Sequence, residues 1–223
     1  MHLYIAYKNY SSWSLRPWIA MKVAGIPFDE TLLPFYHDDS LDKLGERYQI
    51  PAQVPVLIEN DQPIWDSLAI LERLAEQSPD SNLWPENPAL RSLARSAAAE
   101  MHSGFVPLRS TCPMNCRSNK RLSNENLAIV QDDLTRLAKI WARFEQTDKP
   151  EGDFLCGPFS NVDAMYAPVM WRIHGYGLQV SPAFSRWIKA MLNLPAMQEW
   201  LAAAQQEQWI IEHYESAGET VTS

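Results

Sequence analysis

The first third of the chain alternates short apolar runs with one helical pattern. Residues 3–7 are rich in strand-forming side chains and predict a buried strand. Leu15, Ile19 and Val23 recur at every fourth position, which predicts one apolar face of a helix over residues 15–24. Further patterns predict a strand at 29–33, a polar irregular segment at 36–53, a hairpin of 56–58 with 63–65, and a helix at 67–77. This order favours one parallel pair and one antiparallel hairpin, so we expect a mixed sheet.

The pattern changes after this point. Residues 78–88 are dense in proline, serine and asparagine, which predicts a linker. Beyond the linker, apolar positions at three- and four-residue spacing predict helices at 89–104, 126–145, 160–176 and 195–206, and no strand. The sequence therefore predicts an α/β domain over residues 1–77 and a larger all-α domain over residues 89–223, joined by residues 78–88.

Charge and composition exclude several classes of partner. The 223-residue chain has a formal net charge of −8, whereas nucleic acid and anionic membranes attract a basic surface. We expect no signal peptide and no membrane span, because no segment has either pattern. Cys112, Cys116 and Cys156 are spaced as neither a redox pair nor a zinc site. They indicate reduced thiols in a cytoplasmic protein.

Two motifs in the α/β domain each admit a structural and a functional interpretation. Pro55 follows Val54 in a strand-like run, where proline is expected at an edge or a bulge. The alternative is a cis bond that turns the peptide groups of Val54 toward a ligand. Asp66 and Ser67 suit a helix start as a cap and a favourable acid. Alternatively they form an anchor in which Ser67 holds a carboxylate and Asp66 an ammonium group.

Two further motifs carry serine at a predicted helix start. Ser160 and Asp163 form a capping box, which we interpret as a folding signal for a core helix. The turn "KNYSSWSLRPW" leads into the first helix, and Ser14 is expected to cap it. This leaves the hydroxyls of Ser11 and Ser12 for another purpose.

In their order and spacing these motifs resemble the glutathione transferase family over nearly the whole chain. The turn "SSWSLR" is most similar to the zeta-class pattern "SSCS-x-R", with Trp13 in place of cysteine. That departure argues against the maleylacetoacetate isomerisation of the zeta class. The stretch 100–115 looks more like a bacterial group without a settled class name. The resemblance implies a thioredoxin-like domain with a mixed sheet and a helical-bundle domain. It also implies a homodimer, glutathione as co-substrate and no metal.

The resemblance also implies roles for the site residues. Val54, beside Pro55, would pair with the cysteinyl backbone of glutathione, while Asp66 and Ser67 would hold its γ-glutamyl end. For the glycine carboxylate we favour Gln53 among four polar candidates, the others being His37, Ser40 and Lys43. A free thiol has a pKa of about 8.5, and a serine hydroxyl and a helix N-terminus both lower it. Ser11 is our first candidate for that hydroxyl and Ser12 the alternative. For Arg16 we favour a structural ion pair, the alternative being a contribution to the electrostatic field at the thiol.

The second substrate would be a small electrophile bound against the helical domain. Its candidate contacts are Met101, His102, Phe105, Arg109, Met114 and Trp171, although most such residues belong to protein cores. Arg109 carries more weight, because an arginine beside a polar cleft suggests an anionic group on the substrate. The resemblance implies a detoxifying transferase of alkyl or aryl groups. The alternatives are a zeta-like isomerase and a non-catalytic binding or regulatory protein on the same fold.

Overall fold

A four-stranded mixed sheet forms the centre of the N-terminal half. The computed structural model describes residues 1–35 and 38–221. Its strands are β1 (His2–Ile5), β2 (Asp29–Leu32), β3 (Val56–Glu59) and β4 (Gln62–Trp65), in the order β2-β1-β3-β4. β1 and β2 run parallel and are joined by α1 (Ser12–Val23), whereas β3 pairs antiparallel with β1 and β4. The mixed sheet predicted from the sequence is confirmed.

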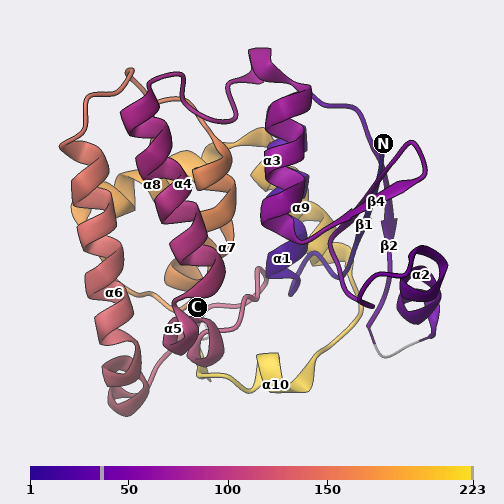
Figure 1. Cartoon of the computed structure of the whole chain (residues 1–223). Helices are drawn as coiled ribbons and strands as arrows, with labels where there is room; N and C mark the ends of the chain where they lie inside the picture. Colours follow the sequence, from indigo (N-terminus) through magenta and orange to yellow (C-terminus); the bar gives the residue numbers. More distant parts are fainter. Residues whose placement is uncertain (36–37, 222–223) are drawn as a thin grey trace.

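Helices cover both faces of this sheet. Leu3, Ile5 and Leu57 face α1 and α3 (Ser67–Gln77) in the main core. Ala6 and Val56 belong to a smaller cluster that includes side chains of α2 (Ser40–Tyr48). In Figure 1, α2 stands beyond the strands at the right of the molecule, and α1 and α3 lie on the other side of them. The prediction that 36–53 is irregular was wrong, because 40–48 form α2. This helix is short, and only three of its residues form an apolar stripe, namely Leu41, Leu44 and Tyr48.

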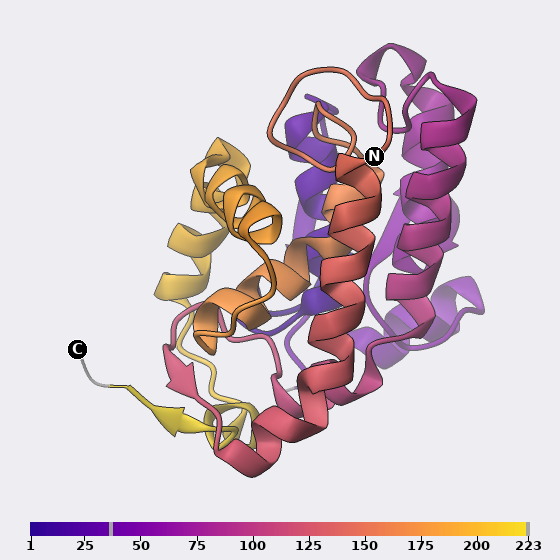
Figure 2. The same cartoon turned by 90° about the vertical axis from the view of Figure 1, so that its left-hand side faces the viewer.

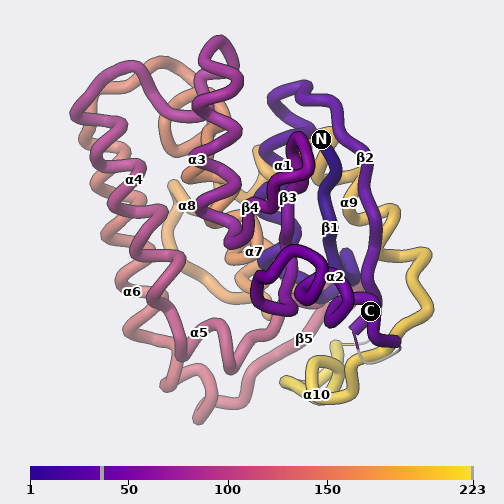
Figure 3. The backbone as a smooth tube through the Cα atoms, turned by 45° about the vertical axis from the view of Figure 1, so that its right-hand side comes forward, coloured from indigo at the N-terminus to yellow at the C-terminus, as the bar shows by residue number. Residues whose placement is uncertain are grey.

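The remaining chain is mainly helical. Its helices are a 3₁₀ turn (Pro79–Ser81), α4 (Pro88–Ser103), α5 (Val106–Thr111), α6 (Asn124–Glu145), α7 (Asn161–Gly175), α8 (Pro182–Asn193), α9 (Pro195–Gln206) and α10 (Glu212–Glu215). α7 is buried along nearly its whole length and packs against α1 and α4. The main core is therefore continuous between the two halves of the chain. Figure 3 shows how the helical layer runs alongside the sheet and its helices.

Several elements differ from the sequence prediction. α5, α8 and α10 were not predicted, and a short strand pair occurs beyond the linker. β5 (Lys120–Arg121) pairs antiparallel with β6 (Glu219–Thr220) near the C-terminus, as Figure 2 shows at the lower left. Two-residue strands are too short to give an alternating pattern. Within the described ranges, no helix is long and apolar enough to cross a membrane.

The start of α7 is built around a buried carboxylate. Asp163 accepts hydrogen bonds from the backbone N–H groups of Leu155 and Ser160, each at 3.0 Å. The Ser160 hydroxyl and the Trp187 indole N–H also donate to it, at 3.1 and 2.8 Å. Burial raises the pKa of Asp163 to about 6, and these donors act in the opposite direction. Ser160 and Asp163 thus form the capping box and tie α7 to the preceding loop and to α8.

Replacement of Ser160 tests this network. Ser160→Ala removes one donor from a buried carboxylate, so we expect the free energy of unfolding to fall by about 0.5–2 kcal/mol in urea denaturation. Ser96→Ala is the matched control, because Ser96 is exposed on α4 and bonds only to the carbonyl of Ser92. It should change stability by a few tenths of a kcal/mol at most. An equal loss in both variants would contradict the structural role of the capping box.

Candidate functional site

The serine turn connects the end of β1 to α1 and is held by a third serine. The first residue of α1 is Ser12, and Ser11 occupies the cap position without a side-chain capping bond. Ser14 lies inside the first helical turn and is fully buried. Its hydroxyl oxygen accepts the backbone N–H of Ala6 at 3.1 Å and the hydroxyl of Ser11 at 2.8 Å. The prediction that Ser14 caps the helix was therefore wrong: it ties the turn back to the strand.

Ser11 and Ser12 line a cavity of about 330 Å³, here called the serine cavity. Its lining consists of Tyr10, Ser11, Ser12, Trp13, Val106, Arg109, Ser110, Arg172 and Tyr214. The hydroxyl of Ser12 has no hydrogen-bond partner in the described part of the chain. The serine cavity thus lies between the serine turn, α5, α7 and the C-terminal segment.

A second cavity of about 350 Å³, here called the proline-loop cavity, adjoins it. Its lining consists of Trp13, Gln53, Val54, Pro55, Asp66, Ser67 and His102. The Val54–Pro55 bond is cis, and β3 lies inside the sheet, so the edge-strand interpretation of this proline was wrong. Val54 is only 8% exposed, yet its backbone N–H and C=O have no hydrogen-bond partner among the described residues. Because Val54 lines the cavity, these two peptide groups can pair with an extended ligand there.

Asp66 stands at the start of α3 in an unusual backbone conformation. One of its carboxylate oxygens accepts the N–H of Leu68 at 2.8 Å, and the other lies 2.7 Å from Nε2 of His102. Its φ of 73° and ψ of 133° fall in a region that side chains rarely adopt and that costs about 1–3 kcal/mol. Such a conformation is typical of functional positions, because the surrounding structure has to impose it.

Arg16 contacts two residues of the cavity linings, Trp13 and Ser67. It is 1% exposed, and its Nε donates to the carbonyl of Met165 on α7 at 3.2 Å. One terminal nitrogen lies 3.4 Å from the hydroxyl oxygen of Ser67, and the guanidinium stacks 4.0 Å from the centre of the Trp13 ring. Burial and the charges of Arg172 and Arg109 lower the pKa of Arg16 to about 9. The ion pair expected for Arg16 is absent among the described residues.

Two further arginines line the serine cavity, and neither pairs with a carboxylate of the described residues. Arg172 is 6% exposed, donates to the carbonyl of Pro168 at 3.2 Å, and has no described partner for its Nε. Burial lowers the pKa of Arg172 to about 10, and burial also lowers the pKa of Arg109. The two bonds of Arg109 go to carbonyl groups, those of His102 and Gly104. Since no acidic side chain belongs to the described lining, the cavity favours an anion.

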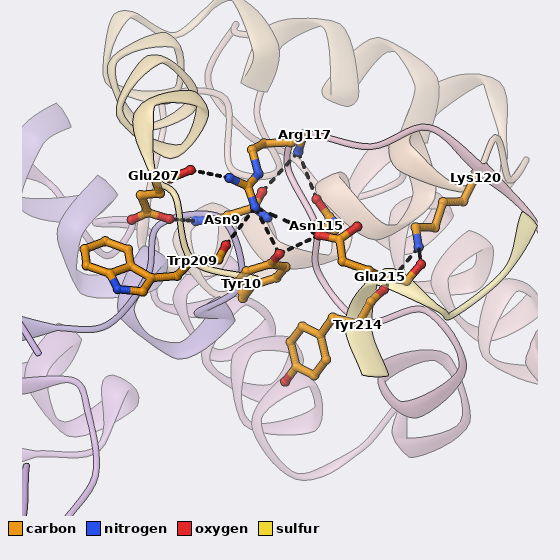
Figure 4. Close-up of polar contacts among 9 residues, drawn as sticks. All are labelled: Asn9, Tyr10, Asn115, Arg117, Lys120, Glu207, Trp209, Tyr214 and Glu215. Carbon is orange, nitrogen blue, oxygen red and sulfur yellow. Dashed lines mark hydrogen bonds and ion pairs between the residues drawn. The ribbon is translucent and has the colours of Figure 1, made fainter. Parts of the chain in front are cut away.

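The C-terminal segment, residues 207–221, ties the serine turn to the helical domain. The carboxylate of Glu207 accepts the backbone N–H groups of Lys8 and Asn9, at 2.6 and 3.0 Å. Arg117 donates to the carbonyls of Glu207 and Trp209, at 2.5 and 3.1 Å. Figure 4 shows this arginine at the centre of the network. The turn is thereby held from the side opposite to the strand.

The same network positions two tyrosines of the serine cavity. The hydroxyl of Tyr10 donates to Glu215 at 2.5 Å and accepts from Arg117 at 3.0 Å. Lys120 donates to the carbonyl of Tyr214 at 3.1 Å. The ring of Tyr214 packs edge-on against that of Tyr10 at 5.5 Å, and its phenol takes no part in the contacts drawn in Figure 4. Tyr214 therefore remains available to a ligand in the cavity.

The structure brings together most of the predicted glutathione-site residues. Gln53, Val54, Pro55, Asp66 and Ser67 share one cavity, and Ser11 and Ser12 line the other. Of the other candidates for the glycine carboxylate, Ser40 bonds to Asp38, Lys43 pairs with Asp39, and His37 lies outside the described residues.

Only two of the six second-substrate candidates line one of these cavities. Arg109 lines the serine cavity, and His102 lines the proline-loop cavity. The other four are buried in the main core and line neither cavity, namely Met101, Phe105, Met114 and Trp171. Sequence reasoning missed Tyr10, Trp13, Val106, Ser110, Arg172 and Tyr214. The sequence did contain a signal for Arg172, because it is an arginine in a mainly apolar helix. In contrast, nothing in the sequence links Tyr214 to a turn about 200 residues away.

The cysteines take no part in either cavity. Burial raises the pKa of Cys112 and of Cys156 to about 12, and it raises the pKa of Cys116 as well. A thiol is nucleophilic as its thiolate, so these groups are poor nucleophiles at neutral pH. Any thiol chemistry in the serine cavity requires a thiol from a ligand.

Comparison with known proteins agrees with this geometry. Residues 10–77 match the family model of the glutathione S-transferase N-terminal domain. A probable maleylacetoacetate isomerase of Caenorhabditis elegans is 32% identical over 197 residues, covering 87% of this chain and 89% of the relative. A stringent starvation protein A homologue of Haemophilus ducreyi is 27% identical over 142 residues, 64% of this chain and 62% of that protein, so less than two thirds of its length is matched.

A solved structure shows the same fold. It is a glutathione transferase homologue from Burkholderia with bound glutathione, with a TM-score of 0.67 and 20% identity. The superposition covers 93% of this chain and 98% of that chain. The thioredoxin-like domain with its mixed sheet, followed by a helical domain, is therefore the fold of this chain.

Proposed function

The chain belongs to the glutathione S-transferase family, and on that premise we propose that it is an enzyme that activates the thiol of glutathione toward a small anionic electrophile. The observation that carries the proposal is the unpaired backbone of Val54 in a cavity that also holds Asp66 and Ser67. This arrangement fits a peptide that has both a carboxylate and an ammonium group. The Burkholderia homologue with bound glutathione supports that choice of ligand.

In this proposal glutathione occupies the proline-loop cavity in an extended form. The N–H and C=O of Val54 pair with its cysteinyl backbone, as in an added strand. The γ-glutamyl carboxylate binds Ser67 and the free N–H groups of α3, close to the charge of Arg16. Its ammonium group binds Asp66, and its glycine carboxylate binds Gln53, which lines the same cavity.

The serine turn then receives the sulfur. Ser11 donates a hydrogen bond to the thiolate, and the N-terminus of α1 adds its positive partial charge. A hydroxyl has one proton, which Ser11 directs to Ser14 in the structure. When a thiolate binds, that proton can turn to the sulfur while Ser14 donates to Ser11 in its place. Ser12 is the alternative donor, because its hydroxyl has no described partner.

The electrophile binds in the serine cavity with an anionic group near Arg109 and Arg172. In a conjugation, the thiolate electron pair forms a bond to carbon, and the leaving group departs with its own pair while the thiol proton passes to solvent. In an isomerisation, the thiolate adds to a carbon–carbon double bond and is later expelled. The maleylacetoacetate isomerase relative favours this second reaction as the alternative. Because another relative is named a stringent starvation protein and not a transferase, a non-catalytic binding or regulatory role is a further alternative. We also propose a cytoplasmic homodimer, as the resemblance implies.

Glutathione binding is the first test. Ser67→Ala and Asp66→Asn should each weaken the affinity measured by calorimetry by about 10- to 100-fold, because each removes a charge-assisted hydrogen bond. Ser160→Ala is the matched control, since it alters a buried serine away from both cavities and should leave the affinity unchanged. If both site variants bind glutathione as tightly as the wild type, Asp66 and Ser67 are not part of the glutathione site.

The anionic electrophile is tested with a matched pair of substrates. We expect kcat/KM for 4-(chloromethyl)benzoate to exceed that for 4-(chloromethyl)benzamide, and Arg109→Met to reduce this preference by about tenfold or more. Arg109→Lys should retain part of it. Arg136→Met is the control, because Arg136 pairs with Glu100 on the exposed surface. A preference for the amide in the wild type, or the same ratio in every variant, would contradict the role of Arg109.

A further inference from the structure

Trp13 stands at the boundary between the two cavities. Among the described residues it alone belongs to both linings. The anchors proposed for glutathione lie in the proline-loop cavity, and the serine hydroxyls lie in the serine cavity. The cysteinyl side chain of glutathione must therefore pass the indole of Trp13 to reach the serines, and a group carried on its sulfur then shares the serine cavity with that indole.

The indole is held in place from three elements. Arg16 of α1 lies 4.0 Å and Arg109 of α5 lies 4.9 Å from its ring centre, so two guanidinium groups stack on it. The ring of His102 on α4 meets it edge-on at 5.4 Å. Arg16 is itself buried and bonded to α7, and His102 is bonded to Asp66. A ring fixed in this way forms a wall of defined size between the cavities.

The serine cavity is also small. Its volume of about 330 Å³ lies at the lower end of the range for ligand pockets. Arg109 is fixed by two carbonyl groups and by this same ring, so the boundary and the proposed anion site share one side chain. A large apolar group would need to displace the indole from its cations, whereas a compact group would not.

We propose that Trp13 is a specificity-determining residue that restricts the enzyme to compact groups on the glutathione sulfur. This inference rests on the proposed binding of glutathione in the proline-loop cavity. It assigns a role to the one position at which the serine turn departs from the zeta-class pattern. Removal of the indole should join the two cavities and admit bulkier groups without removing any of the anchors proposed for glutathione.

The test compares S-methylglutathione with S-hexylglutathione by calorimetry on the full chain. Wild-type protein should bind the methyl derivative at least about tenfold more tightly, and Trp13→Ala should bring the two affinities to within about threefold of each other. The preference of Trp13→Phe for the methyl derivative should lie between that of the wild type and that of Trp13→Ala. Ile129→Ala is the control, because Ile129 is exposed on α6 and lines neither cavity, and it should keep the wild-type preference.

The outcomes separate the two proposals. Equal binding of both derivatives by the wild type, or an unchanged preference in Trp13→Ala, would overturn the role of Trp13 while glutathione binding stands. If Trp13→Ala does not fold, Trp13→Phe replaces it in the test. An unchanged preference in Trp13→Phe would likewise overturn the role of Trp13. Absence of glutathione binding by the wild type would refute the proposed function, and the role of Trp13 with it.

Discussion

The buried guanidinium of Arg16 is the constraint on which the candidate site depends. Burial of a charge costs several kcal/mol unless polar groups surround it, and here they are a carbonyl on α7, the Ser67 hydroxyl and the face of Trp13. These contacts join α1 to α3 and α7, so they also set the position of one domain against the other. Arg16 lacks an ion pair among the described residues and contacts Ser67 and Trp13 of the cavity linings, so its charge attracts an anion bound in the adjoining cavity. In surroundings of low dielectric that attraction is stronger than in water.

The two cavities follow from this junction. The proline-loop cavity lies above Ser67, and the serine cavity lies where the serine turn meets α5 and α7, with Trp13 between them. The serine turn is held by Ser14 on the strand side and by Glu207 on the side of the C-terminal segment. A turn fixed from both sides keeps the oxygen atoms of its hydroxyls in place, so only their protons need to turn when a thiol binds. The network of Figure 4 is thus part of the site, although most of it contacts no ligand.

The sequence predicted those features that depend on local patterns. The sheet, α1, α3 and the long helices follow from apolar spacing. Short motifs indicated Val54, Asp66 and Ser67 as site candidates, and these three residues share one cavity. The prediction from the sequence failed where the role of a residue depends on contacts with other parts of the chain. Ser14 has the residue type and position of a cap, but its partner is the N–H of Ala6 on the strand. Met101 and Trp171 have the character of pocket residues, but the continuous core between the domains buries them. Tyr214 enters the site only because Lys120 and Arg117 hold the C-terminal segment there.

The central claim is that a serine of the turn lowers the pKa of the glutathione thiol. The ultraviolet absorbance of the thiolate, titrated against pH for glutathione bound to wild type, Ser11→Ala and Ser12→Ala, measures this directly. The account predicts that the bound thiol titrates below the free value of about 8.5 in wild type. It also predicts that Ser11→Ala moves the titration to higher pH by about one unit or more, which corresponds to about 1.4 kcal/mol, and that Ser12→Ala has a smaller effect. A Ser11→Ala titration that coincides with wild type would contradict the account.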